Sequence, residues 1–207
     1  AGDLAGVTAV SSPAVNQQRL GGPSGPKWYE AMEKEYRQCS EGTATRGPVW
    51  ELVPVDQLPR GAKPIPCGWV SRVKTEDKGD GESTYEKHKM RITAGGHRQK
   101  LGRDYDATWA PVVAFAVLRL LIAFAATSHF EITQVDFDGA YLHAPLEDEQ
   151  IFMEQPWMFE RVGPNGEVMV CRLLRALYGL KQAGRLWYQT LRAWMESYGF
   201  MCMDMDQ

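Results

Sequence analysis

Asp136 is the first residue whose type and place in the chain could do chemistry. It follows a run of β-forming residues, so it is expected at the end of a strand, which is a rigid mount for a carboxylate. An aspartate in that place can point into a cleft and hold a hard cation through oxygen. The same position also suits a turn or helix-cap residue, and Asp138 is expected to cap a short helical turn over 139–143. Taken alone, Asp136 leaves metal binding and a structural role open.

A second group is a run of alternating cations. Lys87, Lys89 and Arg91 are two residues apart, so they share one face of a strand. Three cations in a row suit a chain of phosphates, either a triphosphate or a nucleic-acid backbone. An ordinary solvated edge strand carries lysines in the same way, because edge charges oppose aggregation. The spacing alone does not separate these two interpretations.

A third group lies in the loop 177–181, which reads Leu-Tyr-Gly-Leu-Lys. Gly179 permits a tight turn or a close approach between two backbones. Tyr178 offers a flat apolar surface and Lys181 a positive charge. An ordinary loop between a strand and a helix, with one aromatic residue in the core, would have the same composition.

Hydrophobic periodicity predicts the elements that position these residues, and their mixture indicates an α+β fold. Helices are expected over 27–39, 112–126 and 183–198, the second of them buried. Strands are expected over 50–53, 68–74, 85–94, 129–137, 151–154 and 168–172. The second and third strands form a basic β-hairpin. Residues 1–26 are rich in small residues and proline without a sustained period, so they are interpreted as a disordered lead-in or linker.

Charge is divided into blocks although the net charge is only −3. Residues 129–160 hold eight Asp or Glu and no Lys or Arg. Residues 171–192 hold five Lys or Arg and no acid, and residues 69–103 hold nine Lys or Arg against five acids. This order fits a cation site between two phosphate-binding elements, and it also fits three unrelated solvated faces.

Several other classes of protein find no support in the sequence. The four cysteines are far apart and form no C-x-x-C pair, which argues against a zinc site or a disulfide framework. The chain contains no Walker A, G-x-G-x-x-G, H-E-x-x-H or G-x-S-x-G motif. The apolar stretch 110–127 includes Arg119, which favours a buried helix over a membrane span.

In their order along the chain, the motifs resemble the reverse transcriptase of copia-type LTR retrotransposons. The resemblance runs from about Trp28 to the end of the chain. Trp-Glu-Leu-Val at 50–53, Trp-Val at 69–70, and the Lys-x-Arg-x-x-Ala-x-Gly-x-x-Gln pattern at 89–99 follow the family. The stretch 102–112 has its Gly-x-Asp-Tyr-x-x-Thr-x-Ala-Pro-Val pattern. Met-Glu-Gln-Pro at 153–156 and Leu-Tyr-Gly-Leu-Lys-Gln-Ala at 177–183 are distinctive of it.

The resemblance implies a right-hand polymerase fold, with fingers over 27–111 and an incomplete palm over 112–207. The palm is expected to stop before the family's paired-aspartate hairpin. The resemblance makes Asp136 the first catalytic carboxylate and, with the Phe137 backbone carbonyl, a ligand of Mg²⁺. The nucleotide-binding residues that it implies are Lys89, Arg91, Tyr141, Tyr178 and Lys181. In the family, the residue at the position of Tyr141 excludes a ribose 2′-OH.

The function implied is that of a fragment of an RNA-directed DNA polymerase, which copies retrotransposon RNA into DNA by two-metal nucleotidyl transfer. The implied partners are an RNA template, a DNA primer or RNA–DNA hybrid, dNTPs and the rest of a Gag-Pol-type polyprotein, without a membrane. The implied location is intracellular, in a cytoplasmic virus-like particle or the nucleus.

An alternative is a catalytically dead relic, or a domesticated fragment that only binds nucleic acid or protein. It is motivated by the missing aspartate pair and by Gly95 and His97, which replace a usual basic and a usual aromatic residue. Whether the fragment is itself an enzyme stays open.

Overall fold

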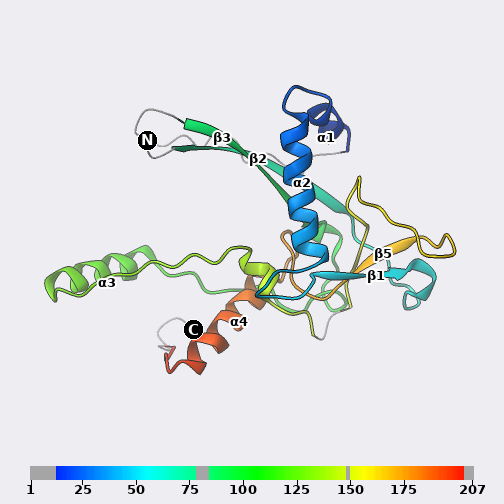
Figure 1. Cartoon of the computed structure of the whole chain (residues 1–207). Helices are drawn as coiled ribbons and strands as arrows, with labels where there is room; N and C mark the ends of the chain where they lie inside the picture. Colours follow the sequence, from blue (N-terminus) through cyan, green and yellow to red (C-terminus); the bar gives the residue numbers. More distant parts are fainter. Residues whose placement is uncertain (1–12, 78–83, 148–149, 203–207) are drawn as a thin grey trace.

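The computed structural model describes residues 13–77, 84–147 and 150–202 (Figure 1). The helices are α1 (Pro13–Leu20), α2 (Gly25–Ser40), α3 (Phe115–Thr127) and α4 (Ala183–Ser197). The strands are β1 (Trp50–Pro54), β2 (Cys67–Asp77), β3 (Thr84–Ala94), β4 (Phe152–Met153) and β5 (Met169–Leu173). Three short 3₁₀ turns are η1 (Val55–Gln57), η2 (Gly96–Arg98) and η3 (Ala140–His143). The mixture of helix and sheet confirms the α+β class.

Helix α2 forms because its apolar residues recur at helical spacing and a proline lies in its first turn. Trp28, Met32, Tyr36 and Cys39 are buried along one stripe of the helix. Helix α1 packs beside it, with the Arg19 guanidinium 5.7 Å from the centre of the Trp28 ring. Residues 13–20, expected as part of a disordered lead-in or linker, form helix α1, and residues 25–26 belong to α2. The rest of that prediction, residues 1–12, lies outside the described residues.

The predicted basic hairpin is confirmed. Strands β2 and β3 pair antiparallel from Cys67 opposite Ala94 to Asp77 opposite Thr84. Side chains alternate between two faces, so the hairpin has an apolar face and a charged face. The apolar face buries Trp69 against its partner Ile92 near the base of the hairpin. The charged face carries Arg72, Lys74, Lys87, Lys89 and Arg91.

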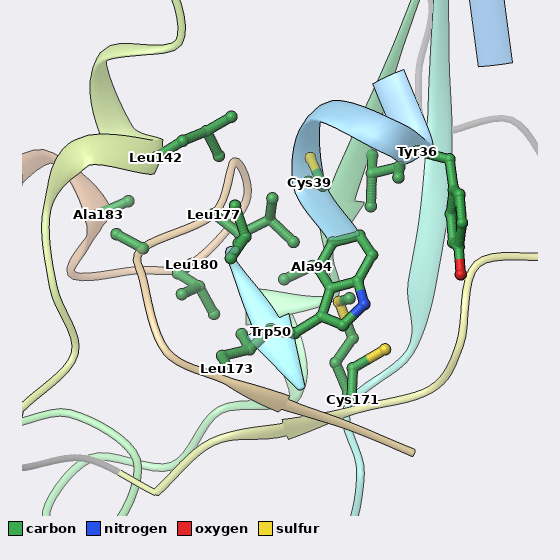
Figure 2. Close-up of a cluster of buried hydrophobic side chains, with 14 of the residues drawn as sticks. Tyr36, Cys39, Trp50, Ala94, Leu142, Cys171, Leu173, Leu177, Leu180 and Ala183 are labelled. Carbon is green, nitrogen blue, oxygen red and sulfur yellow. The ribbon is translucent and has the colours of Figure 1, made fainter. Parts of the chain in front are cut away.

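A second sheet has the order β1-β5-β4, with every pair antiparallel. The main core lies where this sheet meets α2, the end of β3, η3 and the loop before α4. Figure 2 shows side chains from these elements in one cluster, among them Cys39, Trp50, Ala94, Leu142 and Leu177. The core thus fixes the end of the basic strand β3 against the loop 177–181.

The predicted burial of the second helix is wrong. Helix α3 forms, but of its residues only Ala125 is buried, while Phe115 is 77% exposed and Leu120 is 69% exposed. In Figure 1 the helix lies away from the rest of the chain, between two extended segments. Apolar composition leads to burial only where another element offers a matching surface.

The strand predicted over 129–137 is also wrong. Residues 130–137 have no regular secondary structure, and no β-pairing within the described residues involves them. A strand needs a neighbour to accept its hydrogen bonds, so β-forming residues are not sufficient. None of the helices in the described part of the chain combines the length and apolar content needed to cross a lipid bilayer.

Candidate functional site

A pocket of about 460 Å³ lies between α2, β3, the turn 43–46, the segment 138–143 and Tyr178. Lys89 and Arg91 reach it from the charged face of β3, as does Lys87. Arg46 adds a further cation from the turn after α2. With Lys34 of α2, the pocket is therefore lined by cations from three separate segments, which suits an anionic ligand.

Tyr178 meets Arg91 at this pocket, and Tyr141 packs against Tyr178. The Arg91 guanidinium lies 4.9 Å from the centre of the Tyr178 ring, within the range of a cation–π contact. The Tyr141 ring lies 5.3 Å from the Tyr178 ring at an interplanar angle of 58°. Burial raises the pKa of Tyr178, and the positive charge of Arg91 opposes that rise. Four of the predicted residues, Lys89, Arg91, Tyr141 and Tyr178, are thus brought together.

Lys89 is in an environment that favours a bound anion. Its pKa is lowered, first by burial and then by the positive charges of Arg91 and Lys74. The charged form of Lys89 is thus less favourable here than in water. An anion in the pocket would offset both effects.

The loop carrying Tyr178 is held by close backbone contact with the end of β3. The Ala94 N–H donates to the Tyr178 carbonyl at 2.7 Å. Gly179 has a φ of +91°, and a Cβ atom there would lie 2.2 Å from the Ala94 carbonyl oxygen. A Cβ atom on Gly96 would lie 2.0 Å from the Gly179 carbonyl oxygen. The close approach expected at Gly179 is therefore present, and it depends on a second glycine.

Glu35 is a pocket residue that sequence reasoning missed. Its carboxylate accepts a hydrogen bond from the Ile92 N–H of β3 at 3.3 Å. Burial raises the pKa of Glu35, while that hydrogen bond and the charges of Arg91 and Lys89 oppose the rise. Glu35 is three residues after Met32 and four before Cys39, so it interrupts the apolar stripe of α2. A charged residue within the apolar stripe is the signal in the sequence that could have identified Glu35 as a pocket residue.

Asp136 and Lys181 do not join the pocket. Asp136 is exposed, and Asp138, two residues on, lines the pocket instead. The Phe137 ring packs against Trp187 at 5.2 Å and against Trp194 at 6.1 Å, which fixes this segment to α4. Lys181 Nζ lies 3.2 Å from the Tyr105 hydroxyl, at a separate pocket.

The donor set for a divalent metal is incomplete in the described part of the chain. Asp136 and the Phe137 carbonyl supply oxygen, which suits a hard cation such as Mg²⁺. A two-metal centre needs several converging carboxylates. The described residues contain no group of three or more His, Cys, Asp and Glu side chains that could hold a metal ion. These residues therefore do not fit a complete two-metal centre.

Known proteins resemble this chain over most of its length. A family model described as reverse transcriptase (RNA-dependent DNA polymerase) matches residues 48–207. The retrovirus-related Pol polyprotein from transposon TNT 1-94 of Nicotiana tabacum is 34% identical over 189 residues, covering 91% of this chain and 13% of that protein. The corresponding polyprotein from transposon RE1 of Arabidopsis thaliana is 32% identical over 195 residues, covering 94% of this chain and 12% of that protein. The chain therefore spans only a small part of each of these relatives. No solved structure matches it.

Proposed function

Because this chain belongs to the reverse transcriptase (RNA-dependent DNA polymerase) family of copia-type retrotransposon Pol polyproteins, we propose that its pocket receives the incoming dNTP of an RNA-directed DNA polymerase. One observation carries the proposal: Lys89, Arg91 and Tyr178 meet at a single pocket. The two cations suit a triphosphate, because charge-assisted bonds to phosphate oxygens are strong. Tyr178 offers the pocket a flat surface for the base, and Tyr141, whose ring packs against Tyr178, is proposed to lie beside the sugar.

In this proposal residues 27–111 are the fingers and residues 112–207 are part of the palm. The charged face of the β2–β3 hairpin extends the cationic surface beyond the pocket through Arg72 and Lys74, which are both exposed. Such a face suits the phosphate backbone of an RNA template or an RNA–DNA hybrid. The DNA primer and the rest of the Gag-Pol-type polyprotein complete the proposed set of partners.

The chemistry proposed for the whole polymerase is attack of the primer 3′-OH on the α-phosphate of the dNTP, with release of pyrophosphate. The residues of this chain would bind and orient the triphosphate and neutralise its charge through Lys89 and Arg91. Tyr141 would restrict the space at the sugar 2′ position. Asp136 and the Phe137 carbonyl would be part of a Mg²⁺ site, as Lewis acid chemistry in the family requires.

Binding of dTTP in the presence of an RNA–DNA template–primer tests the pocket directly. Arg91→Ala and Lys89→Ala should each weaken dTTP binding about tenfold or more, because a hydrogen bond to a charged group contributes about 1.5–3 kcal/mol. Lys63→Ala is the matched control, since Lys63 is an exposed cation at a different pocket. If Arg91→Ala and Lys89→Ala bind dTTP as well as the Lys63→Ala control does, the pocket is not the nucleotide site.

A test of the role of Asp136 requires a longer polypeptide that contains this chain and polymerises DNA. Asp136→Ala should abolish primer extension there while leaving template–primer binding intact, because one carboxylate of a metal site is lost. Primer extension that survives this substitution rules out the assignment.

The binding-only alternative is favoured by one observation: Asp136 is exposed and outside the pocket lining. A longer polypeptide that binds the RNA–DNA hybrid tightly but extends no primer would support it. Extension that depends on Asp136 would exclude it.

A further inference from the structure

Two buried glutamines join the loop before α4 to the segment after β3. Gln99 is 5% exposed and Gln182 is 1% exposed. Gln99 Nε2 donates to Gln182 Oε1 at 3.0 Å, and Gln99 Oε1 accepts from the Lys181 backbone N–H at 2.8 Å. Gln182 Nε2 donates to the Asp104 backbone carbonyl at 2.9 Å. Both amides therefore use their oxygen and their nitrogen inside the protein, and we call this pair the glutamine network.

The partners at each end fix the orientation of both amides. A backbone N–H can only donate, so Lys181 requires the oxygen of Gln99. A backbone carbonyl can only accept, so Asp104 requires the nitrogen of Gln182. Asp104 is itself held, since its Oδ2 accepts from the Lys100 N–H at 2.7 Å and its Oδ1 accepts from Arg103 Nε at 2.8 Å. The network thus connects the loop to an anchored segment.

We propose that Gln99 and Gln182 are positioning residues that hold Tyr178 against Arg91, and so set the affinity of the pocket for a deoxynucleoside triphosphate. This inference rests on the proposed function of that pocket. The backbone around Tyr178 is tied at two points: its own carbonyl to the Ala94 N–H, and the Lys181 N–H to Gln99. Neither glutamine lines the pocket, so both act through the loop and not on the ligand.

Loss of the glutamine network should weaken binding of the deoxynucleoside triphosphate more than binding of the RNA–DNA duplex. Without Gln99, the loop keeps the bond between Ala94 and Tyr178 but loses its tie at Lys181. The Tyr178 ring can then leave its place beside Arg91, which weakens triphosphate binding. The charged face of the β2–β3 hairpin is not part of this loop, so duplex binding should be retained. A general loss of folded protein would instead lower both affinities together.

Gln155 offers a matched control. Its Nε2 donates to the carbonyls of Arg161 and Met169, each at 2.8 Å, and its Oε1 accepts from the Arg161 N–H at 2.9 Å. It therefore holds a loop through both its amide nitrogen and its amide oxygen, as Gln99 does. None of residues 155–161 lines the pocket.

The experiment measures two affinities for Gln99→Met and Gln155→Met: that for dTTP with template–primer present, and that for the RNA–DNA duplex alone. Gln99→Met should weaken dTTP binding about tenfold and leave duplex binding within about twofold, while Gln155→Met leaves both unchanged. Gln182→Met, which keeps the bond from Lys181 to Gln99, should give a smaller loss for dTTP. If Gln99→Met matches Gln155→Met, or lowers both affinities equally, the positioning role is wrong.

A second measurement does not depend on how the variants fold. Hydrogen exchange of the wild-type chain should show the Lys181 amide protected to about the same extent as the Ala94 amide, because both anchor the loop. Rapid hydrogen exchange at the Lys181 backbone amide would show that its bond to Gln99 is absent, and would overturn the proposed network. A wild-type chain that has a protected Lys181 amide but binds no dTTP instead contradicts the proposed nucleotide function, and the positioning role with it.

Discussion

Replacing Gly179 with alanine tests how the loop 177–181 is held against β3. Two separate penalties apply at this residue. Its φ of +91° lies in the region that side chains rarely adopt, and the added Cβ would lie 2.2 Å from the Ala94 carbonyl oxygen. The second penalty cannot be relieved by a rotamer change, because both atoms belong to or adjoin the backbone. The loop must move away from β3 to make room.

The expected loss in the free energy of unfolding follows from those two penalties. Positive-φ strain for an L-residue costs about 1–2 kcal/mol. Moving the loop also breaks the hydrogen bond from the Ala94 N–H to the Tyr178 carbonyl, which leaves a buried donor unpaired at a cost of about 1–3 kcal/mol. Gly179→Ala should therefore lower the free energy of unfolding by about 2–5 kcal/mol. In a chain of this size each kcal/mol lowers Tm by about 2–4 °C.

Two further glycines separate the penalties. Gly166 has a φ of +84° and open space within 4 Å of where a Cβ atom would lie, so Gly166→Ala reports the φ strain alone. Gly96 has no positive φ, but its Cβ would lie 2.0 Å from the Gly179 carbonyl oxygen, so Gly96→Ala reports an overlap with the same loop in the absence of φ strain. Urea unfolding followed by tryptophan fluorescence gives all three values. A Gly179→Ala variant no less stable than Gly166→Ala would refute the close contact between the loop and β3.

Three other outcomes follow from buried or packed groups. Burial raises the pKa of Glu35 above its usual 4.5, so the stability it contributes is complete below pH 4.5 and is lost as pH rises through the raised pKa. Glu35→Gln should therefore flatten the dependence of the urea midpoint on pH between pH 4.5 and the raised pKa; an unchanged slope would contradict this. Phe137→Ala should cost about 1–3 kcal/mol and shift the emission of Trp187, because two aromatic contacts to α4 are lost; unchanged emission and stability would show that the contacts are absent. A thiol reagent should modify the exposed Cys202 in the native chain and Cys171 only after unfolding, because burial raises the pKa of the Cys171 thiol to about 12; mass spectrometry distinguishes the two sites.

Sequence reasoning predicted the elements whose patterns are local. The β2–β3 hairpin, α2 and α4 have strong period-2 or period-3.6 spacing, and each formed close to its expected bounds. It failed where the outcome depends on a neighbour. Residues 130–137 are rich in β-formers but have no pairing strand among the described residues, and α3 is apolar but has little to pack against. Pairing and burial are tertiary properties that composition cannot supply.

The residues of the candidate site were likewise predictable where a local pattern places them and unpredictable where a tertiary contact does. Lys89 and Arg91 could be expected to share a face, because a strand fixes alternation. That Tyr178 joins them depends on contact between segments more than 80 residues apart, and only the family resemblance indicated it. Lys181 belongs to the same loop yet faces Tyr105, since neighbouring loop residues point in different directions. Gln99 and Gln182 were not predicted as a pair, because a buried amide is recognised by its partners and not by its spacing.

The exposed segments on both sides of α3 are expected sites of proteolytic cleavage. The helix is flanked by segments 107–114 and 130–137, which have no regular secondary structure, and Trp109 and Phe130 are 65% and 63% exposed. Chymotrypsin cleaves after aromatic residues in exposed, extended chain, so brief digestion should release α3 as a discrete peptide. The main core contains no α3 residue. The nicked chain should therefore keep the β2–β3 hairpin and the pocket together, with the excised helix as the first product.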